Sequence, residues 1–88
     1  MREEILISLK GINCLEEDFK NEVSCCFEDV ENEIIVSDQC RTNNVMNTIC
    51  DVYVAYEDTE DSEEFELFVE VTIDDETGEK HMCVIAAA

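Results

Sequence analysis

The ten residues from Glu64 to Ile73 alternate between apolar and mostly acidic side chains. The apolar set is Phe65, Leu67, Val69, Val71 and Ile73. The other set is Glu64, Glu66, Phe68, Glu70 and Thr72. Successive side chains of a strand point to opposite faces, so a period of two predicts a β-strand with one face in the core. A slip of one residue would place glutamates in that core, and the register is therefore firmly constrained.

Weaker alternation and turn residues predict four further strands. They are residues 3–10 (EEILISLK), 33–37, 48–57 and 79–86, the last following the hairpin turn 74–78 (DDETG). For residues 48–57 a helix with Val45, Ile49 and Val52 on one face is the competing interpretation, and the content of Tyr, Val and Ile favours the strand. Residues 58–63 are predicted to form an acidic turn, and the polar stretch 38–47 a loop.

The sequence predicts one main helix, from Cys14 to Asp29. Asn13 is a favourable N-cap, and Glu16 stands three residues later as in a capping box. The helix would bury one apolar stripe at helical spacing. Its members are Leu15, Phe19, Val23, Cys26, Phe27 and Val30.

These segments together predict an α+β fold in a single domain, residues 1–88. We expect a small two-layer domain, with an antiparallel sheet of four to five strands and one main helix, in the order β-α-β-β-β-β. The net charge of -19 raises the question of disorder. However, 45% of the residues are hydrophobic, and the chain has two Gly and no Pro, which favours a folded core.

The charge also restricts the class of partner. With 24 acidic and five basic residues, the chain would be repelled by the phosphates of nucleic acids and by anionic membranes. A basic protein is the expected partner, because surfaces of opposite charge steer association. The sequence contains neither a stretch of about 20 apolar residues nor a secretory signal pattern, so we expect a cytoplasmic protein with reduced thiols.

The acidic residues are concentrated around the predicted strand 64–73. Twelve of the 24 fall between Glu57 and Glu79, and no Lys or Arg occurs from Thr42 to Glu79. Alternate strand positions lie about 6.7 Å apart, roughly two phosphate steps of one DNA strand. We predict a partner-binding acidic face that imitates a nucleic-acid backbone. Its residues are Glu57, Asp58, Glu60, Asp61, Glu64, Glu66, Phe68, Glu70, Asp74, Asp75 and Glu76.

Phe68 interrupts this acidic face with an aromatic ring. Large aromatic residues within a polar rim are common anchors of protein interfaces. The alternative is that a helix or a partner chain covers Phe68 as a second layer. Tyr53 would have a similar interface role if its strand is adjacent. For the acids themselves, the simpler interpretation is that they keep a small β protein soluble and block edge pairing.

No motif for catalysis or for a cofactor is apparent. The six cysteines lack the C-x-x-C spacing of zinc and redox sites, and burial as small hydrophobic residues is the simpler interpretation. A zinc site from Cys25 or Cys26 with Cys40, His81 and Cys83 would have no spacing signature. The acidic turns do not fit the EF-hand loop, and no Gly-rich phosphate loop is present. We therefore expect no enzyme activity, cofactor or metal.

The sequence favours a small acidic inhibitor that blocks the basic nucleic-acid-binding groove of a host defence nuclease. This would be nucleic-acid mimicry of the anti-CRISPR or anti-restriction type, typical of a phage or mobile element. One alternative is an acidic immunity protein or antitoxin that neutralises a basic toxin nuclease. Another is a structural, self-assembling subunit. The expected state is a monomer or a homodimer.

Overall fold

The strands of the structure form one antiparallel sheet in the order β1-β5-β4-β3-β2. The computed structural model describes residues 2–27 and 30–88, and in this part of the chain five strands and two short helices make a small α+β domain. The elements are α1 (Arg2–Lys10), β1 (Asn13–Leu15), the 3₁₀ turn η1 (Glu16–Asp18), α2 (Phe19–Cys25), β2 (Ile34–Val45), β3 (Thr48–Glu57), β4 (Phe65–Ile73) and β5 (Lys80–Ala87). None of the helices in the described residues is long and apolar enough to cross a membrane.

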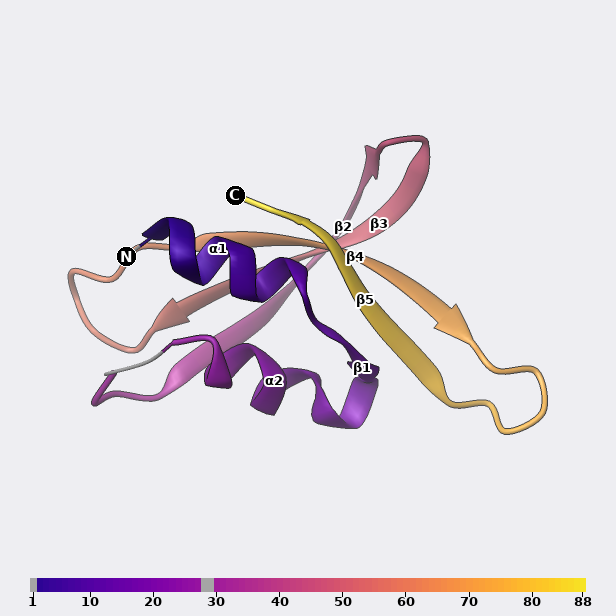
Figure 1. Cartoon of the computed structure of the whole chain (residues 1–88), viewed down its shortest axis with the longest axis horizontal. Helices are drawn as coiled ribbons and strands as arrows, with labels where there is room; N and C mark the ends of the chain where they lie inside the picture. Colours follow the sequence, from indigo (N-terminus) through magenta and orange to yellow (C-terminus); the bar gives the residue numbers. More distant parts are fainter. Residues whose placement is uncertain (1, 28–29) are drawn as a thin grey trace.

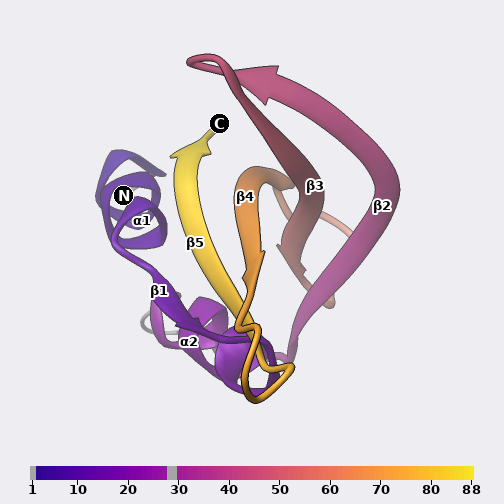
Figure 2. The ribbon, with the colours of Figure 1, turned by 90° about the vertical axis from the view of Figure 1, so that its right-hand side faces the viewer.

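The two helices cover the same face of the sheet. Leu9 from α1 and Val23 from α2 are fully buried in one core cluster with Leu67 of β4. Phe65, Val69, Met82 and Val84 complete the strand side of this core. Helix α1 contacts β5, whereas α2 contacts β1 and β2, the two edge strands. The sheet is accordingly strongly curved, as the view along the long axis shows (Figure 2). This arrangement confirms the antiparallel sheet and the α+β class.

The predicted first strand, residues 3–10, is wrong, because this segment forms helix α1. Ile5, Leu9 and Ile12 are spaced by four and three residues and pack into the core, whereas Ile7 is 70% exposed. Short apolar runs fit both periods, and the helix is favoured here by Leu, Glu and Lys content. Acidic residues also lie in its first turn and Lys10 in its last, as the helix dipole prefers.

The predicted start of the main helix is also wrong. Asn13 is not an N-cap but the first residue of β1, where it pairs with Cys83 of β5. Helix α2 begins only at Phe19 and ends at Cys25, with Cys26 as its C-cap, so the predicted continuation toward Asp29 is wrong as well, while residues 28–29 themselves lie outside the described residues. Residues 13–15, which would have formed the first turn of the helix, instead pair with β5 as strand β1. This strand pairing overrides the capping signal. The apolar stripe is largely right, since Phe19 and Val23 are buried.

The predicted loop, residues 38–47, is instead the outer part of β2. Its residues are polar because this part of the strand is exposed, yet its backbone pairs with β3 from Thr42 to Val45. A β-bulge between Asp38 and Thr42 interrupts the ladder. The strands are joined by Met46 and Asn47, both at positive φ, as in the tight turns that suit twisted hairpins.

The predicted strands 48–57, 64–73 and 79–86 correspond to β3, β4 and β5. Strands β3 and β4 pair only from Asp51–Val69 to Ala55–Phe65. Beyond Asp51 and Val69 the sheet divides into two hairpin arms, which diverge at one end of the molecule (Figure 1). We name residues 42–50 the neutral arm and residues 72–80 the acidic arm. The former contains no charged residue, and the latter has four acids and one Lys.

Candidate protein-binding face

The predicted acidic face follows β4 and its two turns. Glu66, Phe68 and Glu70 point away from the helices, because Phe65, Leu67 and Val69 between them face the core. We name this side of the sheet the open face. Its register partners are Val54 and Val52 on β3, and Ala86 and Cys83 on β5. Phe68 is thus not covered by a helix of the described structure.

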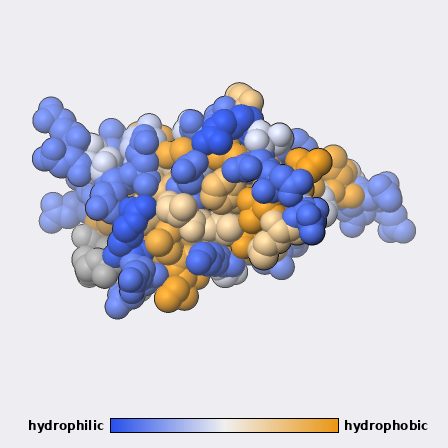
Figure 3. Space-filling view, turned by 90° about the horizontal axis from the view of Figure 1, so that it is seen from above, coloured by the Kyte–Doolittle hydropathy of each residue, from blue (hydrophilic) through white to orange (hydrophobic). Residues whose placement is uncertain are grey.

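The centre of the open face is apolar. Cys50 and Val52 are completely buried and Val54 is 7% exposed, although none of them belongs to the core beneath the helices. Phe68 is half-buried beside Val52. Figure 3, which views the molecule from above relative to Figure 1, shows orange and pale atoms across the middle of the molecule and blue atoms mainly toward its two ends. Because Cys50 and Val52 have no exposed surface, the apolar contact that this side can offer beside them comes from the exposed part of Phe68.

Arg41 is a site residue that sequence reasoning missed. Its guanidinium lies 2.9 Å from a carboxylate oxygen of Glu66. Since β3 separates β2 from β4, this ion pair spans β3 on the face that carries Val52 and Val54. The bulge in β2, with Cys40 at positive φ, redirects the strand at this point. Nothing in the polar stretch 38–47 indicates such a bulge. The ion pair with Arg41 offsets part of the negative charge of Glu66.

Tyr53 does not join Phe68 on this face, and that expectation is wrong. Strand β3 is adjacent to β4, but Tyr53 pairs in register with Leu67 and therefore faces the helices. Its ring packs edge-to-face on Phe19, with the centroids 5.2 Å apart. Burial, together with the nearby Asp38 and Asp51, raises the pKa of the Tyr53 hydroxyl. Tyr53 thus contributes to packing rather than to the open face.

The acidic turn before β4 lies at one end of the sheet. Asp58, Glu60, Asp61 and Glu64 are exposed there. Glu57 is half-buried and accepts a hydrogen bond from the Asn32 amide at 2.8 Å. Glu63 pairs with Arg2 at 2.8 Å, and the Arg2 guanidinium also stacks over Phe65, so α1 is tied to this turn.

The acidic arm lies at the other end, separated from that turn by the length of β4 (Figure 1). Asp74 accepts hydrogen bonds from the backbone amides of Glu76 and Thr77, and these bonds hold the pKa of its carboxyl below the usual value. Asp75 and Glu76 are exposed. Nine strand residues at about 3.3 Å each place the two acidic ends about 30 Å apart. The predicted face is thus a line along one strand, densest in acid at its ends.

The basic residues reduce this charge only locally. The ion pairs found in residues 2–27 and 30–88 are Arg2–Glu63, Lys20–Glu33, Arg41–Glu66 and Lys80–Glu16. Each of them uses a different one of the 24 acids, so the surface stays strongly negative. All these side chains are partly exposed, and each pair is worth at most about 1 kcal/mol.

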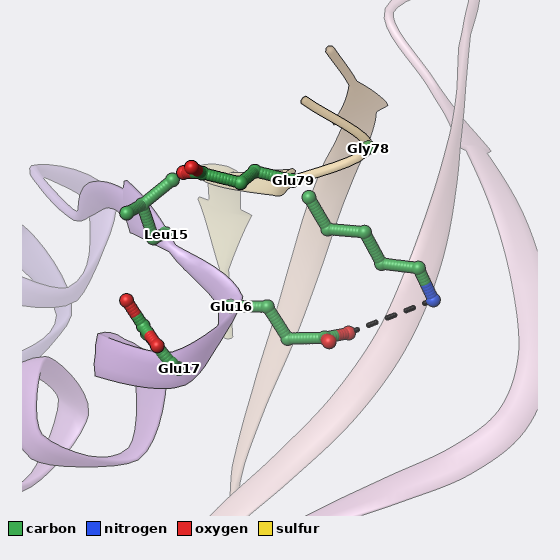
Figure 4. Close-up of a pocket in the computed structure, with 6 residues that line it drawn as sticks. Leu15, Glu16, Glu17, Gly78 and Glu79 are labelled. Carbon is green, nitrogen blue, oxygen red and sulfur yellow. Dashed lines mark ion pairs between the residues drawn. The ribbon is translucent and has the colours of Figure 1, made fainter. Parts of the chain in front are cut away.

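A surface hollow lies between η1 and the acidic arm, lined by Leu15, Glu16, Glu17, Gly78, Glu79 and Lys80. Figure 4 shows Glu16 directed toward Lys80, and their charged atoms are 3.7 Å apart. A neighbouring hollow includes His81, which contacts the Asn13 side chain. In the described residues, no group of three His, Cys, Asp or Glu side chains is arranged to hold a metal ion.

The cysteines are all free thiols in the described residues. Burial, reinforced by nearby Glu70 and Asp51, raises the pKa of the Cys50 thiol. Burial likewise raises the pKa of Cys14 and Cys26, with Glu22 adding to both effects. Since the thiolate is the nucleophile and the metal ligand, these three side chains are poorly suited to either role.

Comparisons of the chain with protein-family models, with curated proteins and with solved structures give no match.

Proposed function

We propose that the protein is a small acidic inhibitor that docks β4 and its two acidic turns onto the basic nucleic-acid-binding groove of a host defence nuclease. The observation that carries the proposal is the placement of half of the acidic residues along one strand and its turns, around the exposed part of Phe68. Carboxylates would occupy the positions that phosphates take in the groove. The mechanism is competitive occupancy and requires no covalent chemistry.

The two acidic ends and the apolar centre have different roles in this proposal. The ends supply charge over about 30 Å, a length that suits a groove holding nearly one turn of duplex. They steer the approach and pair with Lys and Arg of the groove. Phe68 supplies the apolar contact near the middle, where Glu66 is already paired with Arg41. The inhibitor is expected to act on nucleases of the CRISPR or restriction type, whose channels are strongly basic.

The test starts with a pull-down from a host lysate, repeated with competing DNA or RNA and with increasing salt. We expect a basic nuclease to be captured, and both nucleic acid and salt to release it. The purified chain should then block nucleic-acid binding by that nuclease. Captured proteins that are insensitive to nucleic acid and salt would contradict the proposal.

Matched charge variants locate the binding surface. Neutralising Glu60, Asp61 and Glu64 as Gln, Asn and Gln should weaken the complex by roughly tenfold or more and reduce its salt dependence. The control neutralises Glu3, Glu4 and Glu17 as Gln, which are exposed on α1 and η1 and give the same net charge. Equal losses of affinity in the two variants would mean that overall charge, not this surface, determines binding.

A further inference from the structure

The neutral arm differs from the acidic turns of this protein in its lack of charge. Residues 42–50 contain no charged side chain in a chain of net charge -19. The arm also extends beyond the part of the sheet where β3 pairs with β4, so it stands clear of the body (Figure 1). Two copies of this protein, each with a net charge of -19, repel each other overall. The neutral arm is therefore the place where two copies can approach most closely.

The tip of the arm is also apolar. Met46 is 76% exposed and Ile49 is 72% exposed, the two highest values among the large hydrophobic side chains of the described structure. Val45 is half-buried beside them. Exposed apolar side chains that cluster on one projecting element indicate a contact surface more strongly than scattered ones do.

The outer edge of β2 is poorly suited to direct strand addition. The bulge interrupts it at Cys40, whose amide donates to the Asp38 carboxylate at 2.8 Å. The Asn44 amide similarly donates to the Asn43 side chain at 2.8 Å. Bulges and occupied amide groups protect an edge against pairing. A contact through this arm must consequently use side chains at the tip.

We propose that the neutral arm is a self-association surface, on which two copies of this chain pack Met46 and Ile49 against the same residues across a two-fold axis. A nuclease with a basic groove is attracted by the acidic turns, and the arm offers it no charge. A second copy, in contrast, is repelled by those turns, and the arm combines the absence of charge with exposed Met46 and Ile49. Two such arms bury less than about 1,200 Å², the low end of specific interfaces, so the dimer is weak.

The sign of the salt dependence distinguishes this contact from the proposed inhibitor complex. Salt screens the repulsion between two acidic copies, over about 10 Å at 0.1 M and about 3 Å at 1 M. The dimer should therefore become tighter as salt rises, whereas binding of the acidic turns to a basic partner should become weaker. Failure of one proposal does not imply failure of the other.

The experiment is sedimentation equilibrium of the full chain over a wide concentration range, with reductant present because Cys25 and Cys40 are exposed. We expect a monomer–dimer equilibrium whose dissociation constant falls between about 0.1 M and 1 M NaCl. The variant with Met46→Asp and Ile49→Asp should raise that constant at least roughly tenfold, since it places charge in the contact.

The control is Ile73→Asp on the acidic arm, which adds one negative charge at a side chain that is 60% exposed, and Ile49→Asp alone is the arm variant of equal charge. Ile73→Asp should change the dissociation constant by less than roughly twofold, because an isolated exposed residue has little effect. A chain that stays monomeric at both salt concentrations overturns the proposal, as does an equal effect of Ile73→Asp. A monomer whose arm variant loses affinity for a captured nuclease would assign the arm to the partner instead.

Discussion

The neutral arm and the acidic arm have the same architecture and opposite surface chemistry. Both are antiparallel hairpins that leave the sheet where β3 and β4 separate. The neutral arm ends in Met46 and Asn47 and exposes apolar side chains, whereas the acidic arm ends in a loop rich in carboxylates. The comparison teaches that acidity is not a requirement of strand or hairpin formation in this protein. Its uneven placement favours recognition over solubility alone.

The turns of the two arms are also stabilised differently. The neutral arm turns through two residues with φ of 50° and 62°, values at which a side chain other than Asn or Gly is strained. The acidic arm uses Gly78, at φ 76°, and the Asp74 carboxylate as acceptor for two backbone amides. One carboxylate of the acidic arm therefore has a structural role, which separates it from Asp75 and Glu76.

The largest expected effect tests whether the folding of both arms depends on the part of the sheet where β3 pairs with β4. Leu67→Ala removes a fully buried side chain from the shared part of the sheet and should lower the free energy of unfolding by about 3 kcal/mol. Urea denaturation followed by NMR should show both arms unfolding together. Ile73→Ala is the control, and as an exposed site it should cost less than about 0.5 kcal/mol. Resonances of either arm that persist after the core has unfolded would contradict this dependence.

The second prediction is that substitutions in the two turns change the stability of the protein in opposite directions. Gly78→Ala should destabilise the protein by about 1 kcal/mol, because it introduces a Cβ at positive φ. Replacing Met46 with Asn together with Asn47 with Gly should stabilise it by about 1 kcal/mol, since Asn-Gly is the preferred pair for this turn. Thermal denaturation at fixed salt measures both. Since no atom lies within 4 Å of the Cβ position at Gly78, a neutral result there would show that the turn can relax.

The smallest expected effect is a pH dependence confined to the acidic arm. Amide donors from Glu76 and Thr77 lower the pKa of the Asp74 carboxyl from its ordinary value of 3.8. A carboxyl of this kind stabilises the folded turn above its ordinary pKa and loses that contribution as the pH falls through the lowered value. Carboxyl-detected NMR should show Asp74 titrating below its ordinary value of 3.8. A pKa of Asp74 at or above its ordinary value, or amide shifts of Glu76 that do not follow this titration, would contradict the assigned hydrogen bonds.

Predictability from sequence differed between segments for physical reasons. Strand β4 was predictable because a slip would bury glutamates, and β3 because it is rich in Tyr, Val and Ile. The segment from Ile5 to Leu9 fits both a strand and a helix, and only packing against β5 selects the helix. The outer part of β2 was missed because neither face of an exposed arm carries an apolar pattern.

The candidate site was predictable in its acids but not in its neighbours. The alternation placed Phe68 and Glu66 on the side opposite the core. It could not indicate that Arg41 pairs with Glu66 across β3, because the bulge and the strand order are set by distant contacts. Nor could it place Tyr53 under the helices, since that depends on its register with Leu67.

The sequence by itself determined the antiparallel strands, the α+β class and the concentration of acid around β4. These follow from local periodicity and composition, which act along the chain. The tertiary structure alone decided which face the helices cover, where the sheet divides and how far the two arms diverge. These depend on pairings between residues far apart in the chain, and such pairings determine where the charged and the neutral surfaces lie.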